Sequence, residues 1–327
     1  MPNATAAFYT GVKDPEVEAL FDRLLPQMRD AIAARRIAKL SGIWLGGGYG
    51  RGEGGVRRMA AGRTRPYNDI DFFVFMAGAA EAEKADCARQ LAAVAAKYAA
   101  EFGVDVDFCR PRNPADFKKD EDRLMIQELK RGHVALLGGE DLLDHVRTLA
   151  ADELPRMEAL RLLMNRGMGL VLASQKATNL AAQADVDFFL RNLNKAILGA
   201  GDARLIAAKA YAWRIEDRAA KLADPRYEAA VSFKFRPTAE APKDPEAAWN
   251  AAREYWLKGL EAVGLDGRRT VRQAARWVVR RRSLGPLGSF GQDCTVRVLR
   301  EVRKILAHEM NEVRLSASLE RDWKCFN

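Results

Sequence analysis

Two apolar strands, one ending in glycines and the other beginning with aspartates, constrain the fold of this chain most. Residues 41–45 (SGIWL) run into Gly46-Gly47-Gly48, and residues 70–75 (IDFFVF) follow Asp69. Consecutive glycines let a backbone approach a polyphosphate and aim N–H groups at it. Asp69 and Asp71 are two residues apart at the start of a strand, so their side chains share a face. Two such carboxylates repel each other unless a cation lies between them, and Mg²⁺ fits because it prefers oxygen ligands.

The first 150 residues combine short apolar runs with helical patterns. Residues 104–109 alternate apolar and acidic residues, which predicts a third strand with Asp105 and Asp107 on one face. Helical patterns cover residues 78–101 and a stretch around 119–131. Strands and helices joined by short connections are typical of an α+β domain. We therefore predict an α+β domain over residues 1–150, with a mixed β-sheet flanked by helices.

The pattern becomes helical from about residue 152. Apolar residues recur at helical spacing in residues 186–222, 246–263, 269–282 and 294–315, and no convincing strand appears. Three prolines between Arg236 and Pro245 predict a loop there. We therefore predict a second, all-helical domain over residues 151–327.

Composition excludes several classes of protein. With 48% hydrophobic and 30% charged residues the chain can bury a core, and no apolar run approaches the length of about 18 residues that a membrane span needs. The first residues lack the basic and apolar regions of a secretory signal. The four cysteines are far apart without a CxxC pair, which argues against a zinc site or disulfide framework. A cytoplasmic protein without membrane contact is expected.

The net charge of +9 is concentrated near the C-terminus. Residues 268–304 hold eleven basic side chains against two acidic ones, which accounts for the whole excess. Arg269, Arg272, Arg276 and Arg280 are spaced so that they share one helix face. This face would suit a nucleic acid or another acidic partner, and an ordinary solvated arginine face is the alternative.

Other glycine-loop and catalytic motifs fit the sequence less well. Gly50-x-Gly52-x-x-Gly55 matches a dinucleotide fingerprint, but that fingerprint needs an amphipathic helix directly after the glycines. Residues 56–63 are short, basic and closed by Gly62, so the context fails. A P-loop is excluded because no Gly-Lys-Ser/Thr follows, and the three scattered histidines support no catalytic triad.

The glycines and aspartates resemble the motif of the DNA polymerase β-type nucleotidyltransferase superfamily. Its pattern is a hydrophobic residue and two small residues, then Asp-hydrophobic-Asp, then a carboxylate on a later strand; here these are Gly47-Gly48, Asp69-Ile70-Asp71 and Asp107 or Asp105. The stretch from Gly47 to Glu53 is similar to bacterial minimal and aminoglycoside-type members. The resemblance covers residues 40–145. The departure is the spacer of 21 positions from Gly48 to Asp69, which is either a substrate loop or a sign of a degenerate site.

The resemblance implies a nucleotidyltransferase that uses two Mg²⁺ ions. It would transfer a nucleoside monophosphate from an NTP, with ATP expected, to an acceptor hydroxyl and release pyrophosphate. Asp69, Asp71 and Asp107 would be the catalytic and metal-binding residues, and Asp107 would also act as base. The nucleotide-binding residues would be Gly47, Gly48, Tyr49, Arg51 and Lys195.

The acceptor and the role of the helical domain stay open at this point. Lys176 and Tyr211 are alternatives to Lys195 for a phosphate contact from that domain, which would close the cleft and select the acceptor. Three alternative functions remain: a transferase that acts on RNA or protein, a nucleotide-binding pseudoenzyme, and a toxin–antitoxin-type regulatory protein.

Overall fold

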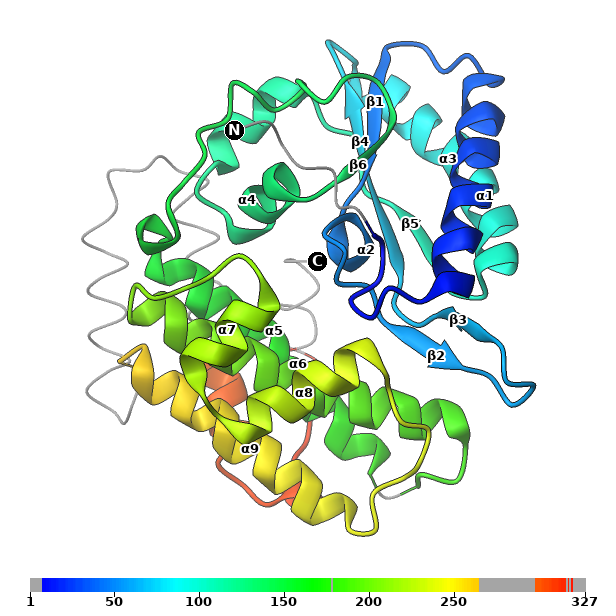
Figure 1. Ribbon diagram of the computed structural model, residues 1–327. Coiled ribbons are helices and arrows are strands. Elements are labelled where there is room, and N and C mark those ends of the chain that lie inside the picture. The colour runs from blue at the N-terminus through cyan, green and yellow to red at the C-terminus, as the bar shows by residue number, and fades with distance from the viewer. Residues whose placement is uncertain (1–7, 178, 265–297, 316, 318, 320–327) are drawn as a thin grey trace. The chain divides into compact units, whose positions relative to one another are not determined.

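The computed structural model describes residues 8–177, 179–264, 298–315, 317 and 319 (Figure 1). These residues separate into two compact units. The first contains the residues up to Leu149 together with Lys234–Pro237, and the second contains Ala150–Phe233 and the residues from Thr238 onward. The first boundary lies beside the division predicted at residue 150, whereas the inclusion of Lys234–Pro237 in the first unit was not predicted.

The first unit has an α+β architecture, as predicted. Its helices are α1 (Pro15–Ala33), α2 (Gly47–Gly50), α3 (Glu81–Phe102), the 3₁₀ helix η1 (Pro114–Asp120) and α4 (Leu124–Arg131). Its strands are β1 (Leu40–Leu45), β2 (Val56–Arg58), β3 (Thr64–Pro66), β4 (Ile70–Met76), β5 (Val106–Phe108) and β6 (Val134–Leu137).

A four-stranded mixed sheet forms the centre of this unit. Its strand order is β5-β4-β1-β6, and a separate two-stranded sheet pairs β2 with β3. Strand β1 is antiparallel to both β4 and β6, while β5 is parallel to β4. Because β1 and β4 run in opposite directions, the end of β1 at Leu45 lies beside the start of β4, where it pairs with Phe72. The glycines that follow β1 therefore lie next to the aspartates that begin β4.

The two faces of the sheet are covered by different helices. Phe72 and Val74 join α1 and α3 in one hydrophobic core, which also contains Ile43 and Leu45. Phe73, Phe75 and Trp44 point to the other face and form a second core with Phe117, Ile126 and Leu129 of η1 and α4. This division follows from the alternation of side chains along a strand.

The spacer between the glycines and the aspartates forms a hairpin. Val56 pairs with Pro66, Arg57 with Arg65 and Arg58 with Thr64. No helix follows the glycines beyond the single turn of α2, which agrees with the rejection of a dinucleotide fold. Helix α1, which the sequence analysis did not predict, begins with Pro15 after Asp14, whose side chain accepts a hydrogen bond from the Val17 N–H.

The described elements of the second unit are helical. They are η2 (Ala151–Glu153), α5 (Arg156–Lys176), α6 (Gln183–Ala207), α7 (Ile215–Leu222), α8 (Pro225–Phe235, whose last two residues belong to the first unit), α9 (Pro245–Ala262), residues 298–305 and η3 (Met310–Glu312). Its core contains Trp249 and Trp256 of α9, whose indole N–H groups donate to the carbonyl oxygens of Leu170 and Leu163 in α5. The loop predicted before Pro245 is present.

Two further expectations concern the membrane and the basic C-terminal segment. None of the helices in the described ranges is long and apolar enough to cross a membrane. The helix predicted over 269–282, with its arginine face, lies outside the described residues, and of the basic segment 268–304 only residues 298–304 are described.

Candidate active site

The predicted aspartates lie together at one end of the sheet. Strands β4 and β5 pair in parallel so that Asp71 is directly opposite Asp107, and the Ile70 N–H donates to the Asp105 carbonyl oxygen at 2.9 Å. Residues opposite each other in a sheet point to the same face, and Asp69 lies two residues before Asp71. The register therefore places Asp69, Asp71 and Asp107 on one face. Asp69 and Asp71 are half-buried, whereas Asp107 is exposed.

This cluster of carboxylates makes the end of the sheet electronegative. Partial burial raises the pKa of Asp107, and the nearby charges of Asp69 and Asp105 raise it further. Burial, followed by the charges of Asp71 and Asp107, raises the pKa of Cys109 to about 11. Carboxylates that lie this close together attract a cation, since a cation relieves their repulsion.

The glycines after β1 touch this cluster. The Gly46 N–H donates to the Asp71 carbonyl oxygen at 2.9 Å. Gly47 has a φ of +60°, and a Cβ on it would lie well inside 3.0 Å of Asp71 Oδ2. A Cβ on Gly48 would come no closer than 3.5 Å to any neighbour, the Glu53 carbonyl oxygen being the nearest, which is ordinary van der Waals contact. Glycine is therefore required at position 47 and not at 48, a distinction that the sequence did not reveal.

Tyr49, which the sequence predicts to bind nucleotide, has a side chain that is engaged within the protein. The side chain is fully buried. Its hydroxyl donates to the Gly55 carbonyl oxygen at 2.8 Å and accepts from the N–H groups of Tyr67 at 2.9 Å and Asn68 at 3.2 Å. Burial raises the pKa of Tyr49, so the hydroxyl keeps its proton. Tyr49 thereby joins both ends of the hairpin just before Asp69.

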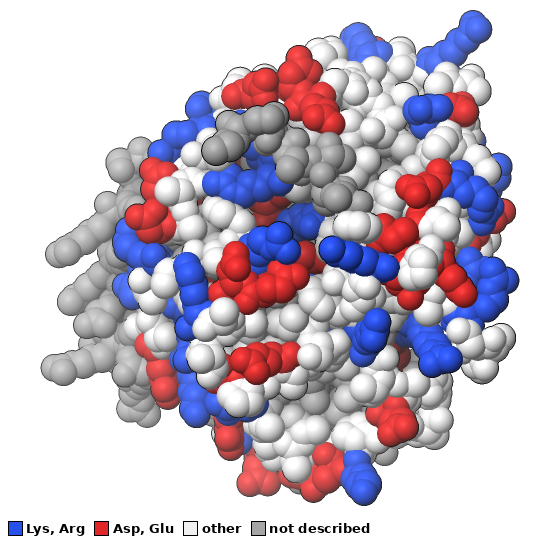
Figure 2. Space-filling view, viewed as in Figure 1, with Lys and Arg blue, Asp and Glu red and all other residues white. Residues whose placement is uncertain are grey.

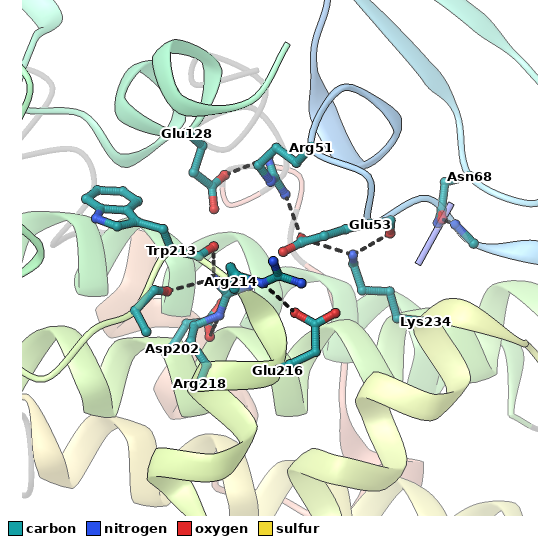
Figure 3. A network of polar contacts seen from close by, with 12 residues as sticks. Arg51, Glu53, Asn68, Glu128, Asp202, Trp213, Arg214, Glu216, Arg218 and Lys234 are labelled. Atoms are coloured by element: carbon teal, nitrogen blue, oxygen red, sulfur yellow. Dashed lines mark hydrogen bonds and ion pairs between the residues drawn. The ribbon is translucent and has the colours of Figure 1, made fainter. Parts of the chain in front are cut away.

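Arg51 belongs to an ion-pair network in the first unit (Figure 3). Its guanidinium contacts Glu128 of α4 at 3.0 Å and Glu53 at 3.4 Å. The Lys234 ammonium donates to the Glu53 carbonyl oxygen at 2.7 Å and lies 3.3 Å from its carboxylate. The Glu53 side chain is 7% exposed, and both cations compensate its buried charge. The contacts with Glu128 and Lys234 were not predicted, because both residues are far from Glu53 in sequence.

The residues expected to bind phosphate from the helical domain lie in the second unit. Lys195 is half-buried in α6. Lys176 pairs with Asp185 at 2.8 Å. Tyr211 is buried, and its hydroxyl accepts a hydrogen bond from Arg218. Arg218 also contacts Asp202 at 3.0 Å and donates to the Trp213 carbonyl oxygen (Figure 3), so Tyr211 belongs to a buried structural network.

The carboxylates of Asp69, Asp71 and Asp107 are ligands of the kind that Mg²⁺ prefers, although these three side chains are not gathered around a single point. Within the described ranges no three His, Cys, Asp or Glu side chains form a group that could hold a metal ion as they stand. Asp69, Asp71 and Asp107 nevertheless share one face and offer hard carboxylate oxygens. Beside them, the missing Cβ of Gly47 leaves room at Asp71 Oδ2.

Comparison with protein-family models, with curated proteins and with solved structures found no match for this chain.

Proposed function

We propose that the chain is a Mg²⁺-dependent nucleotidyltransferase that transfers a nucleoside monophosphate from an NTP, with ATP expected, to an acceptor hydroxyl. The observation that carries this proposal is the parallel register of β4 and β5, which aligns Asp71 with Asp107 beside the glycine turn. The motif order also supports it, since glycines after β1, Asp-Ile-Asp at β4 and an aspartate on β5 resemble the DNA polymerase β-type superfamily.

Each part of the site has a distinct role in this reaction. Positions 46–48 carry no side chains, so a triphosphate can approach the backbone of the glycine turn. Asp69, Asp71 and Asp107 would hold Mg²⁺, which neutralises the phosphate charge and that of the leaving pyrophosphate. Asp105, two residues before Asp107, adds negative charge without facing Asp71 in the register.

Transfer requires the acceptor hydroxyl to lose a proton. Its oxygen forms a bond to the α-phosphorus while the bond between that phosphorus and the bridging oxygen of pyrophosphate breaks. Asp107 would accept the hydroxyl proton, because its carboxylate lies opposite Asp71 on the face where the acceptor hydroxyl would approach. Pyrophosphate carries away the electrons of the broken bond.

The direct test is incubation of the purified chain with each α-³²P-labelled NTP and Mg²⁺. Pyrophosphate release and a labelled product are the expected results. Mutation of a group that hydrogen-bonds a metal ligand typically lowers activity about 10- to 100-fold. Asp69→Asn and Asp71→Asn change a ligand itself, so each should lower the rate of pyrophosphate release by more than this. Stability should be unchanged or slightly higher, because one of several repelling charges is removed.

Asp105→Asn is the matched control for these variants. It removes the same charge from the same cluster and should retain most of the activity, whereas Asp107→Asn should not. Near wild-type turnover in Asp71→Asn would refute the assignment. Nucleotide binding without pyrophosphate release in the wild type would instead identify a nucleotide-binding module.

A further inference from the structure

The β2–β3 hairpin carries a concentrated positive charge. Arg57, Arg58, Arg63 and Arg65 lie on it, and no Asp or Glu occurs between Gly54 and Asn68. The register puts Arg57 directly opposite Arg65. Like charges directly opposite each other on paired strands are destabilising. The hairpin therefore gathers four guanidinium groups on two short strands, where an anionic ligand could contact several of them at once.

Contacts with two helices hold the hairpin in place. The Thr64 hydroxyl donates to Asp14 Oδ1 at 2.6 Å, and its N–H donates to Glu16 Oε2 at 2.8 Å at the start of α1. Arg65 donates to the Glu101 carbonyl oxygen near the end of α3 at 3.2 Å. Asp14 and Glu16, at the start of α1, are thus engaged with Thr64.

The outer part of the hairpin is exposed. Residues 58–63, which include Arg58 and Arg63, are all exposed. The hairpin extends away from the four-stranded sheet (Figure 1), and Lys and Arg side chains are visible over the part of the surface that it occupies (Figure 2). The positive charge is therefore presented to solvent.

The base of the hairpin is fixed beside the candidate active site. Tyr67 and Asn68 connect β3 directly to Asp69, and Asn68 Oδ1 accepts a hydrogen bond from the Gly55 N–H at 3.0 Å. At about 3.3 Å per residue, Arg65 lies at most about 13 Å and Arg63 at most about 20 Å from Asp69 along the strand. The hairpin arginines therefore lie within about 20 Å of the candidate active site, a span that several consecutive phosphates of one strand cover.

We propose that the β2–β3 hairpin is a docking arm for a nucleic acid strand, which it holds by the phosphate backbone. Guanidinium groups suit this ligand because their planar donors match phosphate oxygens bidentately. The strand would present a terminal hydroxyl to Asp69, Asp71 and Asp107. Only this acceptor role rests on the proposed function; binding itself does not.

Fluorescence anisotropy with labelled 20-nucleotide RNA and DNA strands, from 50 to 300 mM salt, tests the proposal. The hairpin variant is Arg58→Gln/Arg63→Gln/Arg65→Gln; Arg57 is kept because its guanidinium lies 4.8 Å from the Tyr67 ring centroid. Each phosphate contact on a single strand contributes about 0.7 to the magnitude of the slope of the logarithm of the binding constant against the logarithm of the salt concentration. Loss of three such contacts should therefore reduce the magnitude of this slope by about two. Affinity at 100 mM salt should fall at least about tenfold.

Two further variants make this result specific to the hairpin. Arg23→Gln/Arg29→Gln/Arg89→Gln removes the same charge from exposed positions on α1 and α3 and should bind like the wild type. The three hairpin arginines changed to lysine should keep the salt slope, and this charge-conserving variant together with thermal melting separates lost binding from lost folding.

Several outcomes would overturn the proposal. These are wild-type binding that is weak and independent of salt, equal losses in the hairpin and control variants, and displacement of the strand by polyglutamate as readily as by unlabelled strand. Strand binding without any nucleotidyl transfer would leave the docking arm standing and refute the proposed function. Transfer to another acceptor without strand binding would support the proposed function and refute the docking arm.

Discussion

Replacing Gly47 with alanine should separate the proposed nucleotidyltransferase activity from the stability of the fold. The backbone at Gly47 has a φ of +60°, a conformation that costs an L-residue roughly 1–2 kcal/mol. A Cβ there would also lie too close to Asp71 Oδ2. That oxygen is the end of a side chain, so the carboxylate can rotate away at a cost of about 0.5–1.5 kcal/mol. The free energy of unfolding should therefore fall by about 1.5–3.5 kcal/mol.

The loss of activity should be larger than this loss of stability suggests. Since the displaced group is the Asp71 carboxylate, a shift of about 1 Å can cost on the order of 100-fold in rate. We expect kcat/KM for nucleotidyl transfer to fall about 100-fold in Gly47→Ala under conditions where the variant is folded. Gly48→Ala is the matched control, because its Cβ meets only an ordinary contact. It should stay within a few-fold of the wild type in both activity and stability.

A double-mutant cycle measures the steric contribution by itself. Chemical denaturation of the wild type, Gly47→Ala, Asp71→Ala and the double variant gives the coupling between the two positions. In the Asp71→Ala background, Gly47→Ala should cost only the backbone strain. Zero coupling, or wild-type activity in Gly47→Ala, would show that Gly47 does not position Asp71 for the reaction.

Three further variants test groups outside the carboxylate cluster. Tyr49→Phe leaves three backbone groups at the base of the hairpin without their hydroxyl partner. Because each unsatisfied group costs about 1–3 kcal/mol, the free energy of unfolding measured by thermal melting should fall by at least about 2 kcal/mol. Activity should also fall, because Asp69 directly follows the groups that lose their partner. Lys234→Met should destabilise the chain in urea by about 1–3 kcal/mol, since Glu53 loses a charged hydrogen-bond donor, while Lys258→Met on α9 serves as an exposed control. Burial lowers the pKa of His133, so its neutral form is favoured in the folded state. The contribution of His133 to stability should be fully present above pH 6.5, the ordinary pKa of histidine. As the pH decreases from about 6.5 to the pKa of the folded state, the free energy of unfolding should decrease by up to about 1.4 kcal/mol per pH unit. His133→Phe should remove this part of the acid sensitivity, and an unchanged pH profile would contradict the assignment.

Much of the fold and the candidate site could be predicted because the signals are local. Short apolar runs predicted the strands now seen as β1 and β4, alternation with a period of two predicted β5, and helical periodicity predicted α3 and α9. The shared face of Asp69 and Asp71 follows from their spacing alone. Helix α1 was missed, although Asp14-Pro15 is a recognisable helix start.

The choice between Asp105 and Asp107 shows what spacing cannot decide. Both lie on one face of the predicted third strand, and local sequence contains no information on the strand that pairs with it. The observed register, Asp71 opposite Asp107, depends on how α3 returns the chain to the edge of the sheet. Register is a property of two segments, so it appears only when both are placed.

Sequence alone was sufficient for the strands β1, β4 and β5, the glycine turn and the acidic character of the site, because each depends on neighbouring residues along the chain, whereas the β2–β3 hairpin was not predicted. Tertiary structure decided which of these residues act on one another. Only there does Tyr49 become a buried tie to Gly55 and Tyr67, and only there does Lys234 reach Glu53. Contacts of this kind join groups that are separated in the chain, and the free energy of burying a polar group without a partner makes them necessary once the chain is compact.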